Sequence, residues 1–479
     1  MNYTMHDFKS INCDGDTRLE KDMIGELPVP ACAYYGIQTQ RAISNFIISE
    51  DHLKDYPTFV WALGAVKLAA VRANHDLGLI NNELANAIEQ ACIEVMDGKF
   101  NDQFPVDMIQ GGAGTSTNMN ANEVIANRAL EILGHEKGEY EHCSPNDNVN
   151  MSQSTNDVYP TSTKIALIQM NQDLVTHLKQ LVTAFGKKGE EFSGILKMGR
   201  TQLQDAVPMT LGQEFCAFAD NLAEEVDRLN DNARLFNEVN LGATAIGTGI
   251  TTVEGYAGAC VEHLKAITGF PITEAPDLVE ATPDTGSFVI YSSALKRMAV
   301  KISKICNDLR LLSSGPRAGI GEINLPPMQP GSSIMPGKIN PVIPELMNQI
   351  CFRVIGNDLT VTFAAEAGQL QLNAMEPVLY YSIIQSITFL IRGMDALRIH
   401  CVDGITANPD VCASRVQKSI GIVTALVPYI GYEHATRIAK IAQETGKGVY
   451  EIVLEEELLS KDKLDEILKP ENMIRPRKI

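Results

Sequence analysis

Apolar residues recur at helical spacing over five long stretches of the chain. The stripe that follows Pro160 consists of Leu167, Leu174, Leu178, Leu181 and Phe185. Similar stripes run over residues 211–239, 287–313, 344–365 and 377–400. Each stretch is longer than the usual helix of about 11–12 residues. The pattern predicts a bundle of long helices, and it has too many apolar residues for one bundle to bury, which indicates helices that also pack between subunits.

The regions on either side of this bundle carry shorter helical patterns. Residues 57–98 have apolar positions on one helical face, and the tail is interrupted at Pro428, Gly431 and Gly446. Residues 1–16 form a loose polar leader without the apolar core of a secretory signal. Strand signals are few and short. We therefore predict a mainly α fold of three domains, namely a mostly helical N-terminal domain at 1–153, the central long-helix bundle at 154–403, and a small C-terminal helical domain at 404–479.

Charge and cysteine usage exclude several classes of protein. The net charge of −19 argues against nucleic acid or an anionic membrane as partner. No run of 18 apolar residues occurs, so no membrane-spanning helix is predicted. None of the ten cysteines stands in C-x-x-C spacing, which argues against a zinc ribbon or a redox pair. Free thiols in a long chain are typical of a reducing cytosol, so we expect a cytoplasmic protein.

One stretch concentrates the groups that could bind an anion. Residues 331–341 read Gly-Ser-Ser-Ile-Met-Pro-Gly-Lys-Ile-Asn-Pro, a composition that a helix interior does not tolerate. Backbone N–H groups of a glycine-containing loop can converge on a carboxylate, and Lys338 adds a full positive charge. For such runs in general, the alternative is an ordinary surface turn.

Three further clusters are rich in hydroxyl and amide side chains. They are Thr115 to Asn122 within a glycine-containing run, Ser154 to Asp157, and Gly199 to Asp205, and we expect each at the end of a helical pattern. Such groups bind carboxylates through many neutral hydrogen bonds, although each cluster alone could be a helix cap or a turn. The glycines at 111–114 follow no predicted strand, which argues against a dinucleotide loop.

All four clusters resemble those of the aspartase/fumarase superfamily of lyases, and the resemblance covers nearly the whole chain. It is closest to the aspartate ammonia-lyase branch, as judged from Gly112-Ala113-Gly114-Thr115, Ser154-Thr155-Asn156 and Thr201-Gln202. Fumarase-type chains are expected to have Gly-Ser-Gly-Thr, Ser-Ser-Asn and Thr-His at these places. Gln202 also differs from the histidine of some aspartases, so no titrating imidazole is available there.

The resemblance implies reversible deamination of L-aspartate to fumarate and ammonia through an aci-carboxylate intermediate. It implies that Ser332 is the base that removes the Cβ proton, and that no metal or organic cofactor is needed. By the same resemblance, the groups that bind the β-carboxylate are Thr115, Ser154, Thr155 and Ser333. Lys338, Asn340 and Thr201 would bind the α-carboxylate, while Asn156 and Gln202 would position the amino group. Since a serine hydroxyl is a weak base in water, Ser332 would need N–H donors from its own loop and the charge of Lys338.

The family resemblance also implies a homotetramer in which each active site draws residues from three subunits. Two alternatives remain open at this point. One is fumarate hydratase activity in the same fold, and the other is a non-catalytic structural relative, which the presence of Ser332 and Lys338 disfavours.

Overall fold

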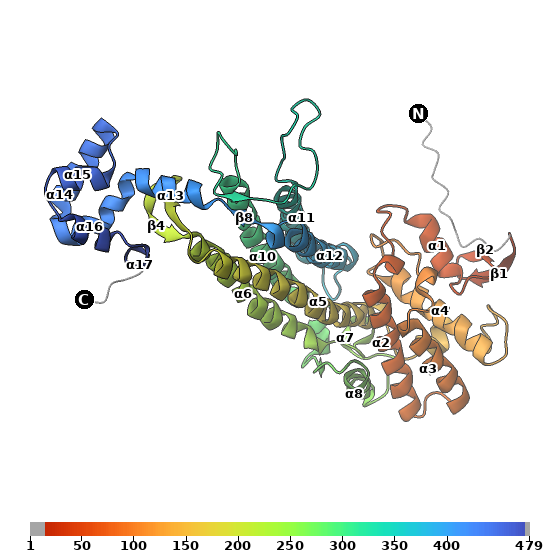
Figure 1. The fold of residues 1–479 in the computed structure, drawn as a ribbon. Helices are drawn as coiled ribbons and strands as arrows, with labels where there is room; N and C mark the ends of the chain where they lie inside the picture. The colour runs from red at the N-terminus through yellow and green to blue at the C-terminus, as the bar shows by residue number, and fades with distance from the viewer. Residues whose placement is uncertain (1–14, 475–479) are drawn as a thin grey trace. The chain divides into compact units, whose positions relative to one another are not determined.

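The computed structural model describes residues 15–474, and the fold is mainly α, as predicted (Figure 1). Of the leader predicted at residues 1–16, residues 1–14 lie outside the described part. The described residues divide into two compact units. Unit 1 contains the residues up to Leu174 together with Arg228–Lys296 and Val354–Thr388, and unit 2 contains Val175–Asp227, Arg297–Arg353 and the residues from Phe389 onward. The three-domain division at residues 153 and 403 stays a prediction.

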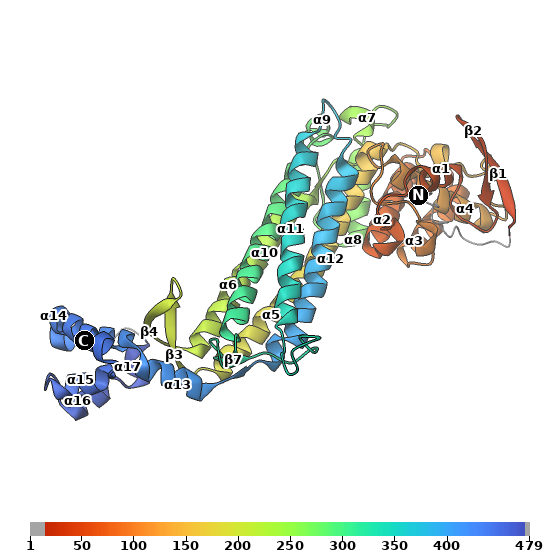
Figure 2. The ribbon, with the colours of Figure 1, turned by 90° about the horizontal axis from the view of Figure 1, so that it is seen from above.

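The five long helices predicted from the apolar stripes are present and run alongside one another (Figure 2). They are α5 (Thr155–Glu191), α6 (Leu211–Ala233), α10 (Gly286–Leu312), α11 (Val342–Glu366) and α12 (Glu376–His400). In unit 1, ring contacts of Tyr380 on α12 join three of them, with centroid distances of 5.2 Å to Tyr159 on α5 and 4.6 Å to Phe288 on α10. The stripes therefore mark the faces that pack in the core.

Helix α5 begins earlier than the sequence suggested. We expected it to follow Pro160, but it starts at Thr155 and Pro160 lies inside it. A proline cannot donate to the carbonyl four residues before it, which is that of Asn156. The side chain of Asn240 replaces the missing donor, since its Nδ2 donates to the Asn156 carbonyl at 3.0 Å.

Unit 1 also holds short helices and two small sheets. Strands β1 (Thr17–Asp22) and β2 (Gly25–Pro30) form an antiparallel hairpin in which Thr17 faces Pro30. The helices are α1 (Ile37–Asn45), α2 (Pro57–Asp76), α3 (Asn82–Met96), α4 (Thr115–Ile132), α7 (Thr244–Gly247), α8 (Tyr256–Thr268) and α9 (Leu278–Ala281), with short turns η1 (Leu53–Asp55), η2 (Asn101–Gln103), η3 (Pro145–Val149) and η4 (Arg234–Asn237). Strands β5 (Glu238–Val239) and β6 (Thr273–Glu274) pair in parallel.

Unit 2 carries two antiparallel strand pairs and the C-terminal helices. The strands are β3 (Leu196–Thr201) with β4 (Gln204–Thr210), and β7 (Ile323–Asn324) with β8 (Thr406–Ala407). The helices are α13 (Pro409–Lys418), α14 (Val423–Thr445), α15 (Val449–Glu455), α16 (Lys461–Ile467) and α17 (Pro470–Met473), with η5 (Val402–Gly404) and η6 (Ile420–Ile422). Pro428 lies inside α14, and the break falls at Gly431, whose φ is 78°. Gly446 ends α14 in a left-handed conformation, which glycine adopts without strain.

Among residues 15–474, no helix combines the length and the apolar character needed to cross a membrane. Eight of the cysteines described are free thiols, and most of them are buried. Cys32 is disulfide-bonded, so the expectation of free thiols is wrong at that position.

Candidate active site

The first polar cluster forms the start of α4. Gly114 is the residue before the helix and has φ 87°, a left-handed conformation that favours glycine. A Cβ at this position would lie 2.3 Å from the ring of Tyr159, so glycine also allows α4 to approach α5 closely. Thr115 is exposed, and its Oγ1 donates to the Gly112 carbonyl at 2.8 Å.

The second cluster forms the start of α5. Asp157 is buried and accepts the N–H groups of Ser154 at 3.0 Å and Gly242 at 2.9 Å. Burial raises its pKa to about 7, against the opposing effect of these hydrogen bonds. Asn156 donates one N–H of its Nδ2 to the Ala245 carbonyl at 2.7 Å, which leaves its amide oxygen and one N–H for a ligand.

The structure brings these two clusters together. Asn118 of α4 donates its Nδ2 to Oγ1 of Thr155 at 3.1 Å, which joins the first turns of α4 and α5. Each helix start carries unpaired N–H groups and a partial positive charge. Two such starts with hydroxyl side chains form an environment suited to a carboxylate.

The fourth cluster lies in unit 2, at the tip of the β3–β4 hairpin. Gln202 and Leu203 form the two-residue turn, with φ of 54° and 62°, where glycine or asparagine is usual. We expected this cluster at the end of a helical pattern, and a strand pair is found instead. Thr201 and Gln202 are exposed, and Gln202 lines a cavity of about 280 Å³ together with Arg200 and Lys304.

The loop at 331–341 lies before α11, and one backbone hydrogen bond and one side-chain hydrogen bond join its two ends. Gly331 donates to the Lys338 carbonyl at 2.8 Å, and Asn340 Nδ2 donates to the Gly331 carbonyl at 2.8 Å. The N–H groups of Ile334 and Met335 donate to Ser332 Oγ at 3.2 and 3.0 Å. Residues 333–339, between these bonded ends, are exposed in the single chain.

The ten predicted site residues therefore fall into two groups. Thr115, Ser154, Thr155 and Asn156 belong to unit 1, where Asn118 and the starts of α4 and α5 hold them together. Unit 2 contains Thr201, Gln202, Ser332, Ser333, Lys338 and Asn340. Within unit 2, Ser332 and Asn340 are joined through their own loop.

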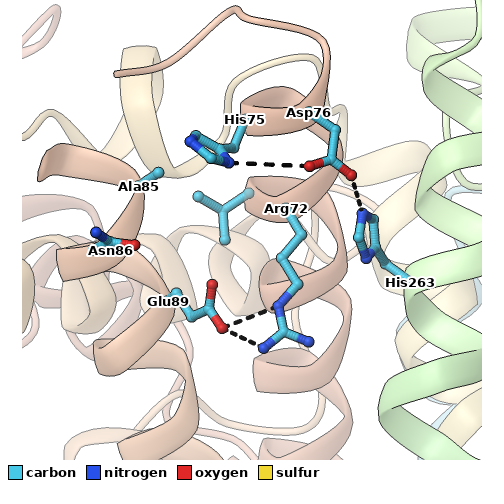
Figure 3. Close-up of a pocket in the computed structure, with 8 residues that line it drawn as sticks. Arg72, His75, Asp76, Ala85, Asn86, Glu89 and His263 are labelled. Carbon is cyan, nitrogen blue, oxygen red and sulfur yellow. Dashed lines mark hydrogen bonds and ion pairs between the residues drawn. The ribbon is translucent and has the colours of Figure 1, made fainter. Parts of the chain in front are cut away.

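Two polar groups of unit 1 lie outside these clusters. One is a pocket of about 230 Å³ lined by residues of α2, α3 and α8. Arg72 pairs there with Glu89, and Asp76 with His263 (Figure 3). It contains none of the predicted site residues, and its charges are paired with one another.

The second group consists of His135, Glu139 and His142, whose ligand atoms lie within 4.8 Å of one another. The two imidazoles are stacked, with centroids 3.7 Å apart and planes 8° from parallel. The lone pairs of two parallel rings do not converge on one ion. As placed, the group does not form a coordination site.

Two buried residues that support the polar clusters, Lys67 and Glu322, were not predicted from the sequence. Lys67, fully buried on α2, donates to Gln153 Oε1 at 2.8 Å, and burial lowers its pKa to about 7. A single lysine within the apolar run from Leu63 to Val71 was a usable signal. Glu322 is buried beside Arg200, and no sequence signal marked it, because its partners are distant in sequence.

Comparison with known proteins identifies the class. Residues 25–356 match the family described as Lyase, and residues 422–475 match the one described as Fumarase C C-terminus. Together with the fold, these matches define a lyase. The chain is 62% identical over 464 residues to Aspartate ammonia-lyase of Pseudomonas aeruginosa, covering 97% of this chain and 98% of that protein. The chain therefore belongs to the aspartase/fumarase superfamily.

Further relatives agree with this placement. Aspartate ammonia-lyase of Escherichia coli K12 is 56% identical over 460 residues, with 96% of each chain covered. The structure of fumarate lyase:delta crystallin from Brucella melitensis bound to cobalt has a TM-score of 0.94 at 54% identity, covering 96% of this chain and 100% of that one. The class II fumarase of Schistosoma mansoni has a TM-score of 0.90 at 33% identity, covering 97% and 100%.

Proposed function

We propose that the chain catalyses the reversible deamination of L-aspartate to fumarate and ammonia. The curated relatives at 56–62% identity over nearly the full chain, all named Aspartate ammonia-lyase, support this activity. The reaction removes a proton from Cβ, and charge then develops on the neighbouring carboxylate. Donors held in place for that charge are the main requirement of the site.

The observation that carries the mechanism is the environment of Ser332. Its Oγ accepts two backbone N–H groups, from Ile334 and Met335. Such donors stabilise an alkoxide and lower the pKa of a hydroxyl, which a serine base requires. No histidine occurs in any of the four polar clusters. Ser332 is therefore the group we assign to abstraction of the Cβ proton.

The two carboxylates of the substrate need separate sets of donors. The start of α4, the start of α5 and the loop would bind the β-carboxylate through Thr115, Ser154, Thr155 and Ser333. Lys338, Asn340 and Thr201 would bind the α-carboxylate. One N–H of Asn340 is used to close the loop, which leaves the second for substrate. In the proposed mechanism, movement of the loop over the bound substrate would exclude water from the site.

The amino group of the substrate needs acceptors. Asn156 and Gln202 each carry an amide oxygen, and one N–H of Asn156 is bonded to the Ala245 carbonyl, which holds that amide in place. An ammonium group has three donors and no acceptor, so these oxygens suit it. A malate hydroxyl would benefit instead from a proton donor of matched pKa, which Gln202 cannot supply. This difference favours ammonia over water as the group released.

We further propose a homotetramer whose active sites each draw residues from three subunits. Helix α11 supports assembly, because Phe352, Leu359 and Phe363 are 61, 56 and 66% exposed and recur at helical spacing. Refolding an inactive variant at Ser332 together with an inactive variant at Ser154 should restore part of the activity. No recovery from mixed tetramers would contradict the sharing of active sites between subunits.

We expect a cytoplasmic location, because eight of the described cysteines are free thiols, although Cys32 is not.

A direct assay tests the proposed activity. Fumarate formation is followed by ultraviolet absorbance with L-aspartate and, in parallel, with L-malate. We expect turnover of aspartate and little or none of malate. A kcat/KM for L-malate equal to or above that for L-aspartate would assign the chain to fumarate hydratases, and inactivity toward both would favour a structural relative.

A further inference from the structure

A buried polar network lies beneath the starts of α4 and α5. At one end is Lys67, which is 1% exposed and donates to Gln153 Oε1 at 2.8 Å and Asn150 Oδ1 at 3.1 Å. Because the lysine nitrogen donates both hydrogen bonds, the atom that it faces in each partner must be an acceptor. Lys67 therefore fixes which end of the Asn150 amide faces it, namely the oxygen.

The orientation of Asn150 fixes that of Asn118. Asn150 Oδ1 accepts Nδ2 of Asn118 at 3.1 Å and also Nδ2 of Asn122 at 3.1 Å. If the Asn118 amide were flipped, its oxygen would face the oxygen of Asn150. The observed orientation leaves Asn118 Oδ1 buried without a hydrogen-bond partner among the described residues. An unpaired buried oxygen costs free energy, so the bonds of the Asn118 nitrogen must maintain this orientation.

The same Asn118 nitrogen contacts a predicted substrate-binding hydroxyl. Its Nδ2 donates to Thr155 Oγ1 at 3.1 Å, so that oxygen acts as an acceptor and its one proton must point elsewhere. Thr115 differs in this respect, because its hydroxyl already donates to the Gly112 carbonyl. The Thr155 hydroxyl proton, by contrast, points away from Asn118 and is available to a ligand.

We propose that Asn118 is a positioning residue that turns the Thr155 hydroxyl proton toward the substrate carboxylate, with its own amide oriented by Lys67 through Asn150. This inference rests on the proposed function, in which Thr155 donates to the β-carboxylate. Asn118 itself does not touch the reacting atoms. The network thus connects a buried lysine to the direction of a single donor in the site.

Replacing Asn118 by aspartate tests the direction of that hydrogen bond. Asn118→Asp keeps the shape but substitutes an acceptor for the donor, so the carboxylate would take the Thr155 proton away from the substrate. The kcat/KM for L-aspartate should fall by about 10- to 100-fold, the range for losing one hydrogen bond to a charged group. Asn118→Ala, which frees the hydroxyl to rotate, should lose less than Asn118→Asp.

A matched control separates this effect from a change in buried charge. Asn122→Asp introduces the same charge and disturbs the same acceptor, Asn150 Oδ1, but the Asn122 amide nitrogen also contacts Met119 Sδ rather than Thr155. It should reduce kcat/KM much less than Asn118→Asp. Equal losses in the two variants would overturn the inference.

A double-mutant cycle with Thr155→Val decides between positioning and simple structural support. In the Thr155→Val background, Asn118→Asp should have little further effect, because the hydroxyl it misdirects is gone. The same fold-loss in both backgrounds, with thermal unfolding lowered equally, would overturn the inference. If Thr155→Val alone leaves kcat/KM unchanged, the assignment of Thr155 in the proposed function fails, and the inference fails with it.

Discussion

Arg200 donates to the carboxylate of Glu322 at 2.6 Å, and Glu322 is fully buried in unit 2. Lys197 lies 2.9 Å from the same carboxylate and Arg415 lies 3.3 Å from it. Burial by itself would raise the pKa of Glu322, but the hydrogen bond from Arg200 and the charge of Lys197 outweigh it and hold that pKa below its usual value. Glu322 is therefore an anion that fastens the β3–β4 hairpin just before Thr201.

Glu322→Gln should destabilise unit 2 strongly. Removing one partner from a buried ion network leaves the others without compensation, at a cost of about 3–5 kcal/mol. Thermal unfolding followed by fluorescence would show a large drop in midpoint. Glu455→Gln is the control, since its pair with Lys447 is exposed and screened by solvent, and its midpoint should hardly move. A similar midpoint for both variants would show that Glu322 does not anchor the hairpin.

Glu376 should make stability depend on pH. It is 1% exposed at the start of α12, and burial raises its pKa to about 8 from 4.5. The folded state therefore holds this proton where the unfolded chain has lost it. Stability falls as pH rises between these two values, by at most about 1.4 kcal/mol per pH unit.

Glu376→Gln removes this titration while keeping the shape. Its unfolding midpoint should equal that of the unchanged chain near pH 4.5, exceed it increasingly up to pH of about 8, and stay above it by a constant amount beyond. Midpoints measured every half unit of pH would test this. A difference that does not vary with pH would mean that Glu376 is ionised throughout.

Gly331 should be indispensable to the loop at 331–341. A Cβ there would lie 2.5 Å from the Lys338 carbonyl oxygen, which the Gly331 N–H itself bonds. Gly331→Ala should therefore open the loop and reduce kcat/KM for L-aspartate by at least about tenfold, comparable to losing one hydrogen bond to a charged group. Gly337→Ala is a useful contrast, because its Cβ would meet nothing within 4 Å although its φ is 81°. Gly337→Ala should cost about 1 kcal/mol in local strain. If it reduced activity more than Gly331→Ala does, Gly331 would not be the residue on which the loop depends.

The exposed apolar face of α11 should be a subunit contact. Phe352→Gln and Phe363→Gln, at positions 61 and 66% exposed, should shift the tetramer toward smaller species in sedimentation velocity and lower the activity. Met23→Gln, which replaces an exposed apolar residue in the β1–β2 turn, should leave the assembly intact. A chain that is active as a monomer would contradict both the assembly and the sharing of sites.

The sequence predicted what is encoded in local spacing, and it failed where distant residues meet. The five long helices followed from apolar periodicity, and the start of α4 followed from the polar run at Thr115. The start of α5 was misplaced because its Pro160 is accommodated by Asn240, 80 residues further along the chain. The same limit applies to Glu322, whose cationic partners come from two separate segments, β3 and α13. Local patterns cannot show which side chain will satisfy a group brought close only by folding.

Ser332→Ala should abolish most of the activity without preventing binding. Removing a general base typically costs about 10²–10⁴-fold in kcat, while KM changes little because the carboxylate donors remain. The neighbouring variant Ser333→Ala removes a proposed carboxylate donor instead, so it should reduce kcat/KM by about tenfold or somewhat more. Both are measured by fumarate formation from L-aspartate, with circular dichroism and sedimentation to confirm intact folding and assembly.

The N–H groups of Ile334 and Met335, which bond Ser332 Oγ, have no acceptor there in the alanine variant, so a local shift of the loop must be distinguished from loss of the base. Ser332→Cys does this, because a thiol keeps an ionisable acceptor at the same place, and its residual activity should rise with pH toward about 8.5, where a free thiol ionises. A Ser332→Ala variant that keeps more than about a tenth of kcat, well above what loss of a general base allows, would remove Ser332 from the role of base.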